Sequence, residues 1–221
     1  MPSYSINSWR DALRPILLSC VVCQQPLMQQ ERICPDCVDL LAKTSRLFDP
    51  TLQLFSRDWH RTRVLGAYDG LLAQLISQGK FSARPELLVH LSRLFANQLL
   101  TTSAVDDMPI VAVPMSRWQR IRRGYNQVDL ITEQLSIHMG LPLLPNLVRH
   151  TGMSKTQHLL TKAARQKNRQ KAFYCHSKAP HRLVLVDDVI TTGATMAAIC
   201  RHLKAAGATY IEVWALALTA K

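Results

Sequence analysis

The sequence predicts an α/β fold in which a parallel sheet is flanked by helices and preceded by a small four-cysteine zinc segment. An apolar run at 183–186 is followed by a polar turn, a helical pattern over 196–206 and an apolar stretch at 208–218. Strand, helix and strand in that order imply parallel strands joined by a right-handed crossover. A second apolar run spans 110–114, and two Cys-x-x-Cys pairs lie near the start of the chain.

The length of 221 residues allows one sizeable α/β domain with a small appendage. We expect an N-terminal helix and zinc knuckle over 1–45, a helical connector over 46–105 and the α/β core over 106–221. No apolar run reaches the roughly 18 residues that a membrane span needs. Charged residues and a proline interrupt the place where a secretory signal would have its apolar centre, so the sequence predicts a cytoplasmic protein.

The chain carries a net charge of +12, which favours polyanionic partners, nucleic acid first. The charge is uneven, because the stretch from Gln134 to Val186 contains no Asp or Glu and many Lys and Arg. Such a run is either a solvated face or an anion-binding surface.

The N-terminal segment begins with a predicted helix over 8–18, and four cysteines follow it. They are Cys20, Cys23, Cys34 and Cys37. Two Cys-x-x-Cys turns at this separation can place four thiolates around one Zn²⁺ ion, and redox disulfides are the alternative. A closed four-sulfur site leaves no position for a substrate, so the zinc is expected to be structural. Cys200 lies in an apolar helical pattern and is expected to be buried.

The middle of the chain alternates helical and extended patterns. The predicted helices are 38–46, 70–77 with a stop at Gly79, 85–100, 127–138 and an exposed 156–168. The predicted strands are 63–68, 110–114 and 141–148, the last interrupted by two prolines and therefore an edge or irregular strand. His138 is read as a helix-end residue rather than a catalytic base. His150 and His158 fall in the basic stretch, where a mobile loop could use them.

The segment after the 110–114 strand is rich in arginine and predicts either a phosphate-binding loop or a solvated basic loop. Its candidate anion-binding residues are Pro114, Met115, Ser116, Arg117, Arg122 and Arg123. Trp118 and Tyr125 are interleaved with the arginines. They are candidates either for contact with single-stranded DNA or for packing beneath the loop.

The turn after the 183–186 strand has the composition of a sugar-phosphate site. Asp187 and Asp188 can accept hydrogen bonds from sugar hydroxyls or reach Mg²⁺ through water. Hydroxyls, a glycine and the start of a helix follow, and together they favour a bound phosphate. These residues are Thr191, Thr192, Gly193, Ala194 and Thr195.

The run D-D-x-x-T-T-G-x-T resembles the phosphoribosyl pyrophosphate (PRPP) signature of type I phosphoribosyltransferases. The resemblance implies a type I phosphoribosyltransferase-like sheet, ribose hydroxyls on Asp187 and Asp188, and the 5-phosphate on 191–195. It also implies that the loop after the 110–114 strand contacts pyrophosphate and that Mg²⁺ accompanies PRPP.

The order of motifs resembles the ComF/GntX family over nearly the whole chain. The cysteine knuckle comes first, Arg122-Arg123-Gly124-Tyr125-Asn126-Gln127 follows, and the PRPP signature comes last. The resemblance implies a role in natural competence or in using external DNA as a nutrient, with single-stranded DNA and a DNA-uptake helicase as partners. The alternatives are an active Mg²⁺-dependent transferase acting on a nucleobase or related acceptor, and a PRPP-sensing regulator.

Overall fold

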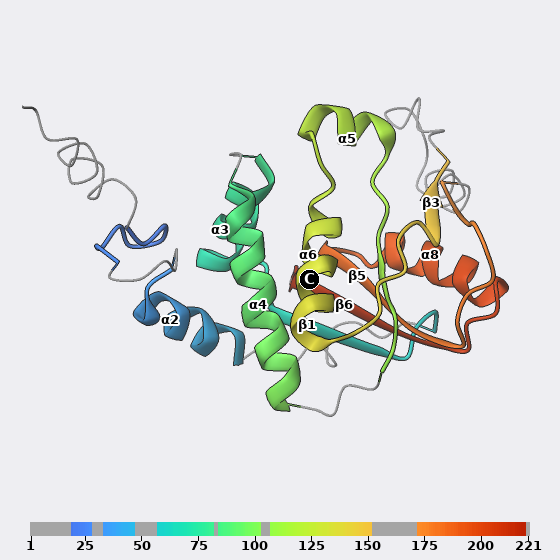
Figure 1. Cartoon of the computed structure of the whole chain (residues 1–221), viewed down its shortest axis with the longest axis horizontal. Coiled ribbons are helices and arrows are strands. Elements are labelled where there is room, and N and C mark those ends of the chain that lie inside the picture. The colour runs from blue at the N-terminus through green and yellow to red at the C-terminus, as the bar shows by residue number, and fades with distance from the viewer. Residues whose placement is uncertain are drawn as a thin grey trace, which may run out of the picture. The chain divides into compact units, whose positions relative to one another are not determined.

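The computed structural model describes residues 19–27, 33–46, 57–81, 84–102, 107–151 and 172–219 (Figure 1). The chain divides into two compact units, Met1–Lys43 and Thr44–Lys221. The predicted domain boundaries at 45 and 105 stay predictions. The predicted helices over 8–18 and 156–168 lie outside the described residues.

The first unit is a short knuckle followed by helix α2 (Pro35–Arg46). A bridge between Ser19 and Pro26 closes the knuckle, and the Cys20 N–H donates to the Gln25 carbonyl at 2.8 Å. The helix begins three residues earlier than the predicted start at 38, because proline is well suited to the first helical position. Its core is small and holds Cys20, Leu27, Ile33, Cys34 and Cys37.

The second unit contains a four-stranded parallel sheet with the strand order β1-β6-β5-β2. The strands are β1 (Arg61–Ala67), β2 (Ile110–Ala112), β5 (Arg182–Ile190) and β6 (Tyr210–Leu218). Both β5 and β6 are almost continuously apolar, as expected for parallel strands covered on both faces. The predicted parallel sheet flanked by helices is confirmed.

Helices cover the two faces of the sheet unequally. Three helices, α3 (Gly70–Phe81), α4 (Pro85–Thr102) and α6 (Gln127–Met139), cover one face, and α4 and α6 pass in front of the strands in Figure 1. Helix α8 (Ala194–Ala205) covers the other. Neighbouring residues of β6 point to opposite faces. Val213 packs in one core with Ile199 of α8, whereas the Trp214 ring lies 6.3 Å from the Phe95 ring of α4.

Two local predictions were wrong, and a third was confirmed only in part. Helix α3 continues through Gly79 to Phe81. Glycine is needed at position 79 because a Cβ there would lie 2.7 Å from Leu88 Cγ. This glycine allows α3 and α4 to approach closely and does not end the helix. The irregular edge strand predicted over 141–148 is reduced to a parallel bridge between Leu143 and Ile110 beside β2 and to Val148, where another strand begins, since the two prolines offer no backbone donors. A short helix, α5 (Arg117–Arg123), stands where the sequence predicted a loop.

Two short strands lie outside the main sheet. Strand β3 (Val148–His150) pairs with β4 (Phe173–Cys175) in an antiparallel ribbon. Cys200 is fully buried in α8, as predicted. Among the residues that the structure describes, none of the helices has both the length and the apolar character needed to cross a bilayer.

Candidate functional site

Strands β2 and β5 are neighbours, so the two segments that the sequence singles out begin at the same edge of the sheet. The Val113 N–H donates to the Val186 carbonyl at 2.9 Å, and the arginine-rich loop starts immediately beyond Val113. Strand β5 continues to Ile190, so Asp187 and Asp188 lie near its end and not in the turn that the sequence predicted, which begins at Thr191. From this edge the chain continues to α6 on one face and to α8 on the other. Ligands of open α/β sheets bind at such a divergence, at the carboxyl ends of the strands.

The turn between β5 and α8 has the local geometry of an anion site. Gly193 is the N-cap of α8 with φ of 71°, in the left-handed region that glycine adopts without strain. The Thr192 hydroxyl accepts the Ala194 N–H at 3.4 Å, and Thr191 and Thr192 are exposed. Gly193 has no side chain to cap the helix, so backbone N–H groups and the positive end of the helix dipole are presented beside two hydroxyls.

Asp187 is the half-buried member of the acidic pair. Its Oδ1 accepts the Asp188 N–H at 2.8 Å. Burial, and next the neighbouring charge of Asp188, raise the pKa of Asp187 to about 7, although this N–H and the Lys80 ammonium act in the opposite direction. Asp187 therefore changes charge near neutral pH.

Asp188 is only 5% exposed and has protein partners on both carboxylate oxygens. Lys80 Nζ, from the end of α3, lies 2.9 Å from Oδ1. The Gln127 amide, at the start of α6, donates to Oδ2. The predicted ribose contacts of the two acids stay predictions. Sequence reasoning missed Lys80 and Gln127, because no local pattern pairs residues so far apart along the chain.

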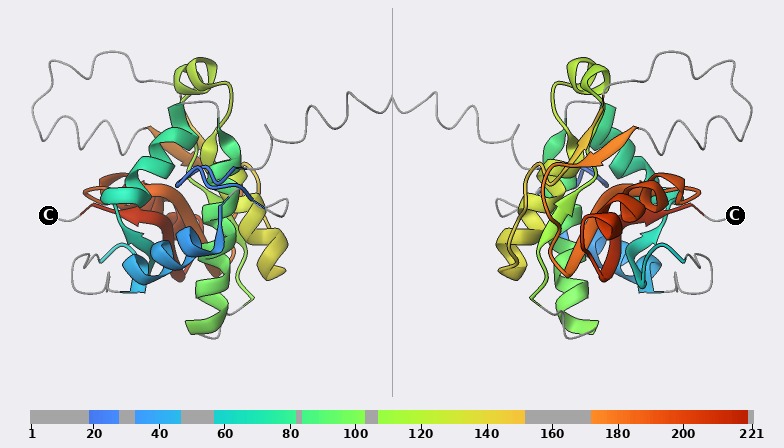
Figure 2. Two further views of the ribbon diagram at one scale, coloured as in Figure 1. Left: turned by 90° about the vertical axis from the view of Figure 1, so that its left-hand side faces the viewer. Right: turned by 90° about the vertical axis from the view of Figure 1, so that its right-hand side faces the viewer.

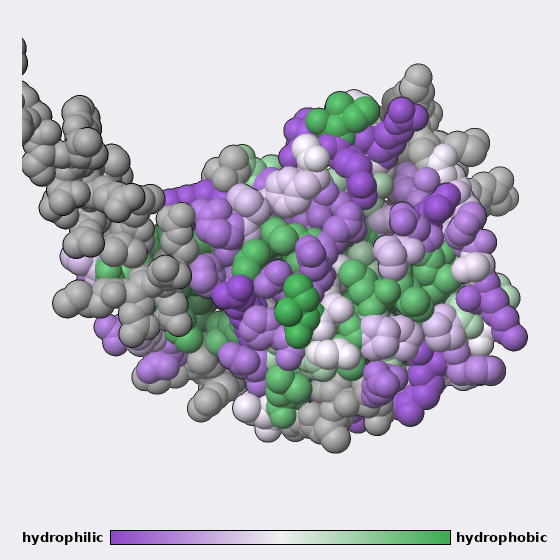
Figure 3. All heavy atoms as spheres, viewed as in Figure 1, coloured by the Kyte–Doolittle hydropathy of each residue, from purple (hydrophilic) through white to green (hydrophobic). Residues whose placement is uncertain are grey.

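Helix α5 stands away from the sheet on two extended segments (Figures 1 and 2). The Ser116 hydroxyl and the Gln119 side chain form a capping box that starts it, and none of its residues is buried. Trp118 is 66% and Ile121 74% exposed. The Arg122 guanidinium lies 5.3 Å from the centre of the Trp118 ring. Hydrophilic residues surround one apolar cluster at this end of the molecule in Figure 3.

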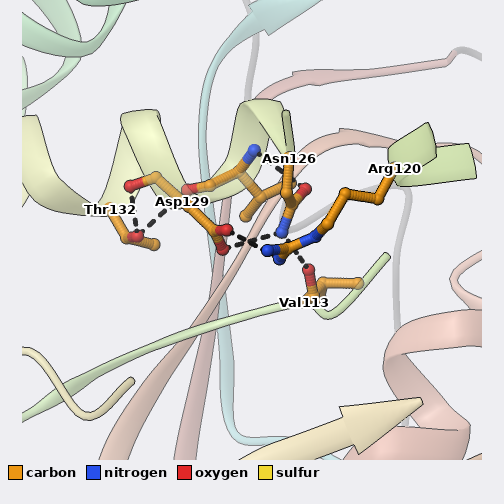
Figure 4. Close-up of polar contacts among 6 residues, drawn as sticks. Val113, Arg120, Asn126, Asp129 and Thr132 are labelled. Carbon is orange, nitrogen blue, oxygen red and sulfur yellow. Dashed lines mark hydrogen bonds and ion pairs between the residues drawn. The ribbon is translucent and has the colours of Figure 1, made fainter. Parts of the chain in front are cut away.

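Asn126 ties the base of the α5 excursion to the sheet (Figure 4). Its amide donates to the Val113 carbonyl at 3.4 Å and to Asp129 Oδ1 at 2.7 Å, and its oxygen caps α6 through the Val128 N–H. Arg120 reaches back from α5 to Asp129 at 3.1 Å.

The end of the excursion is also fastened to the last turn of α3. The half-buried Tyr125 hydroxyl donates to the Gly79 carbonyl at 2.6 Å. The Arg123 guanidinium lies 4.8 Å from the centre of the Phe81 ring. Tyr125 therefore has a packing role, whereas Trp118 is open to a partner. Both contacts flank Lys80.

The four predicted cysteines of the first unit come together, with their sulfur atoms all within 4.8 Å of one another. A tetrahedral Zn²⁺ site with bonds of about 2.3 Å spaces its sulfurs by roughly 3.8 Å, so the cluster fits a metal ion. Burial raises the pKa of Cys20, but N–H groups of Cys23, Cys34 and Val22 outweigh it and lower the pKa to about 6. Burial and the neighbouring thiols raise the pKa of Cys37, so without a positive charge the four sulfurs do not all favour the thiolate.

The structure gives two of the three histidines considered in the sequence analysis surroundings that suit a structural role. His138 is exposed in the last turn of α6, which agrees with its reading as a helix-end residue. His150 packs edge-on at 5.2 Å from the Phe173 ring, and burial lowers its pKa. His158 lies outside the described residues.

Comparisons with known proteins agree with this architecture. Residues 146–221, which contain the acidic turn, match the family described as the phosphoribosyl transferase domain, so the predicted phosphoribosyltransferase-like fold is confirmed. DNA utilization protein YhgH of Escherichia coli (strain K12) is 35% identical over 205 residues, covering 90% of each chain. Competence protein F of Haemophilus influenzae is 34% identical over 167 residues, covering 72% of this chain and 73% of that protein. An adenine phosphoribosyl transferase structure from Trypanosoma brucei is 17% identical with a TM-score of 0.39, covering 64% of this chain and 68% of that one.

Proposed function

This chain belongs to the ComF/GntX family of DNA-utilization and competence proteins, and from that premise we propose that it serves the use of external DNA by binding PRPP or a related phosphoribosyl ligand. The observation that carries the ligand proposal is the turn at the carboxyl edge of β5. There an acidic pair, exposed hydroxyls and a glycine-capped helix start lie beside the loop that follows β2. The cytoplasmic location expected from the sequence is part of this proposal.

In the proposed complex, residues 191–195 hold the 5-phosphate and Asp187 accepts a ribose hydroxyl. The start of the loop after β2, Pro114 to Arg117, faces the pyrophosphate. Carboxylate oxygens are suitable partners for Mg²⁺, and both oxygens of Asp188 already have protein partners. Asp187 is therefore the acid that would approach Mg²⁺ bound to PRPP, and the metal would supply charge to balance the diphosphate. In the first unit, the four cysteines are proposed to hold a structural Zn²⁺ ion.

Calorimetric titration of the full chain with PRPP and Mg²⁺ tests the ligand site. We expect Asp187→Asn to weaken binding roughly tenfold or more, because the amide accepts fewer hydrogen bonds and carries no charge. Glu133→Gln makes the same chemical change at an exposed position of α6 and should leave affinity unchanged. Equal affinity for Asp187→Asn and the unaltered protein would refute the assignment of this turn.

A second proposed contact, with single-stranded DNA, is supported by α5. An exposed tryptophan beside several arginines on a protruding helix offers a stacking surface together with charge for phosphates. Trp118→Ala with Arg122→Ala should weaken binding of a labelled oligothymidine in fluorescence anisotropy. It should also flatten the salt dependence of that binding. Arg93→Ala, an equal loss of charge on the exposed side of α4, is the control.

Release of pyrophosphate separates the two remaining alternatives. An active transferase would liberate it from PRPP in the presence of a nucleobase, whereas a binding protein or regulator would not. The same preparation that binds PRPP should be used, so that a negative result speaks about turnover and not about binding.

A further inference from the structure

The Lys80–Asp188 pair joins one acid of the proposed sugar-phosphate site to a lysine from a distant part of the chain. Lys80 lies in the last turn of α3, and its side chain is 12% exposed, while that of Asp188 is 8% exposed. Burying a carboxylate so far from water is costly unless a counter-charge or hydrogen bonds compensate. Here the counter-charge is the Lys80 ammonium, whose nitrogen lies 2.9 Å from Asp188 Oδ1. In other acidic sites a metal ion can supply this charge.

The chain around Lys80 is held by contacts to the residues that precede and follow it. Gly79, which precedes Lys80, accepts the Tyr125 hydroxyl, and Phe81, which follows it, lies against the Arg123 guanidinium. Gln127 fixes the other oxygen of Asp188 from the start of α6. The pair is thus preorganised by the α5–α6 connection, and little further ordering is needed when a ligand arrives.

We propose that Lys80 is a positioning residue whose ammonium replaces a divalent cation at Asp188, so that the ribose 5-phosphate part of the ligand binds without metal. This inference rests on the proposed function and deepens it. The charge of Lys80 is directed to Asp188, so it leaves the diphosphate of PRPP unbalanced. Metal dependence should therefore be confined to ligands that carry the diphosphate.

The test compares ribose 5-phosphate and PRPP by calorimetry, each in EDTA and in Mg²⁺. The unaltered protein should bind ribose 5-phosphate with affinities that differ less than about twofold between the two conditions, whereas PRPP should bind much more tightly with Mg²⁺. Lys80→Gln keeps a hydrogen-bond donor but removes the charge. It should lose roughly tenfold in affinity for ribose 5-phosphate in EDTA and regain part of it in Mg²⁺.

Two further variants separate charge from general structure. Lys80→Arg keeps the charge and should stay within about threefold of the unaltered protein. Lys204→Met removes a lysine of α8 that bonds only the Arg57 carbonyl among the contacts described, and it should have no effect. Metal rescue of Lys80→Gln is a readout that a purely structural lysine would not give.

Three results would overturn the inference. The first is that the unaltered protein binds ribose 5-phosphate only when Mg²⁺ is present, a result that does not depend on whether Lys80→Gln folds. Unchanged affinity of folded Lys80→Gln in EDTA, or a loss that Mg²⁺ does not restore, would overturn it while leaving the proposed site intact. An unaltered protein that binds neither ligand would refute the proposed function and the inference together.

Discussion

At the residue scale, the two adjacent acids near the end of β5 have unlike environments. Asp188 contacts the side chains of Lys80 and Gln127, whereas Asp187 accepts the backbone N–H of Asp188. One acid is therefore held by two side chains, and the pKa of the other is raised to about 7 by burial and by its charged neighbour. Pairs of this kind divide the tasks of anchoring and ligand contact between neighbouring positions.

The raised pKa of Asp187 predicts a pH-dependent stability. Folded protein keeps a proton on Asp187 that unfolded protein releases above about pH 4. The stabilisation is therefore complete below pH 4 and is lost as pH rises through about 7. Asp187→Asn cannot titrate, so its free energy of unfolding relative to the unaltered protein should rise between pH 4 and pH 8 and be clearly larger at pH 8. Urea denaturation at the two pH values measures this, and a constant difference would contradict the prediction.

The close approach of α3 and α4 predicts that Gly79→Ala is destabilising, although alanine is the better helix former. The new Cβ would lie 2.7 Å from Leu88 Cγ in a fully buried site, which we expect to cost about 1–3 kcal/mol in unfolding free energy. In a Leu88→Ala background the same substitution should cost much less, because the clash is gone. An additive double-mutant cycle would disprove the steric explanation.

At the element scale, the α5 excursion is joined to the sheet by a few contacts of very different strength. Asn126 is 3% exposed and connects the chain just after β2 with the start of α6, whereas the Arg120–Asp129 ion pair has side chains that are 56% and 53% exposed. The buried hydrogen bonds, and not the visible ion pair, should hold the base of the excursion.

This contrast gives a matched prediction for two alanine variants. Asn126→Ala removes the N-cap of α6 and the bond to Val113, and it should lower the free energy of unfolding by about 1–2 kcal/mol. Arg120→Ala removes only the exposed ion pair and should change it by less than about 0.5 kcal/mol. Denaturant titrations of both variants measure these changes. Equal losses of unfolding free energy would contradict the prediction, because they would show that the ion pair stabilises the excursion as much as the buried hydrogen bonds do.

At the scale of the whole molecule, the two units obtain their stability from different sources. The second unit has an extensive apolar core on both faces of its sheet. In the part of the first unit that the structure describes, the apolar cluster has five buried residues, three of which are cysteines. So small a core cannot offset the entropy of ordering its chain, and the metal is expected to supply the difference.

Removal of metal should therefore unfold one unit and spare the other. A strong zinc chelator is expected to abolish hydrogen-exchange protection over 33–46 while leaving protection over 182–190 and 210–218 unchanged. Elemental analysis of the untreated protein should find one zinc ion per chain. Retained protection of α2 after complete loss of metal would contradict a structural role for the cluster.

The sequence by itself determined the features that depend on neighbouring residues. Apolar runs mark β5 and β6, because strands covered on both faces need no polar residues, and Cys-x-x-Cys spacing marks the knuckle, because each turn must offer two sulfurs to one ion. The acidic turn is equally local. Tertiary structure alone decided that Lys80 and Gln127 meet Asp188, and that Gly79 serves packing rather than a helix stop. These contacts join segments that become neighbours only when the helices pack on the sheet. Side-chain periodicity along one element contains no information about which residues of another element will lie beside it.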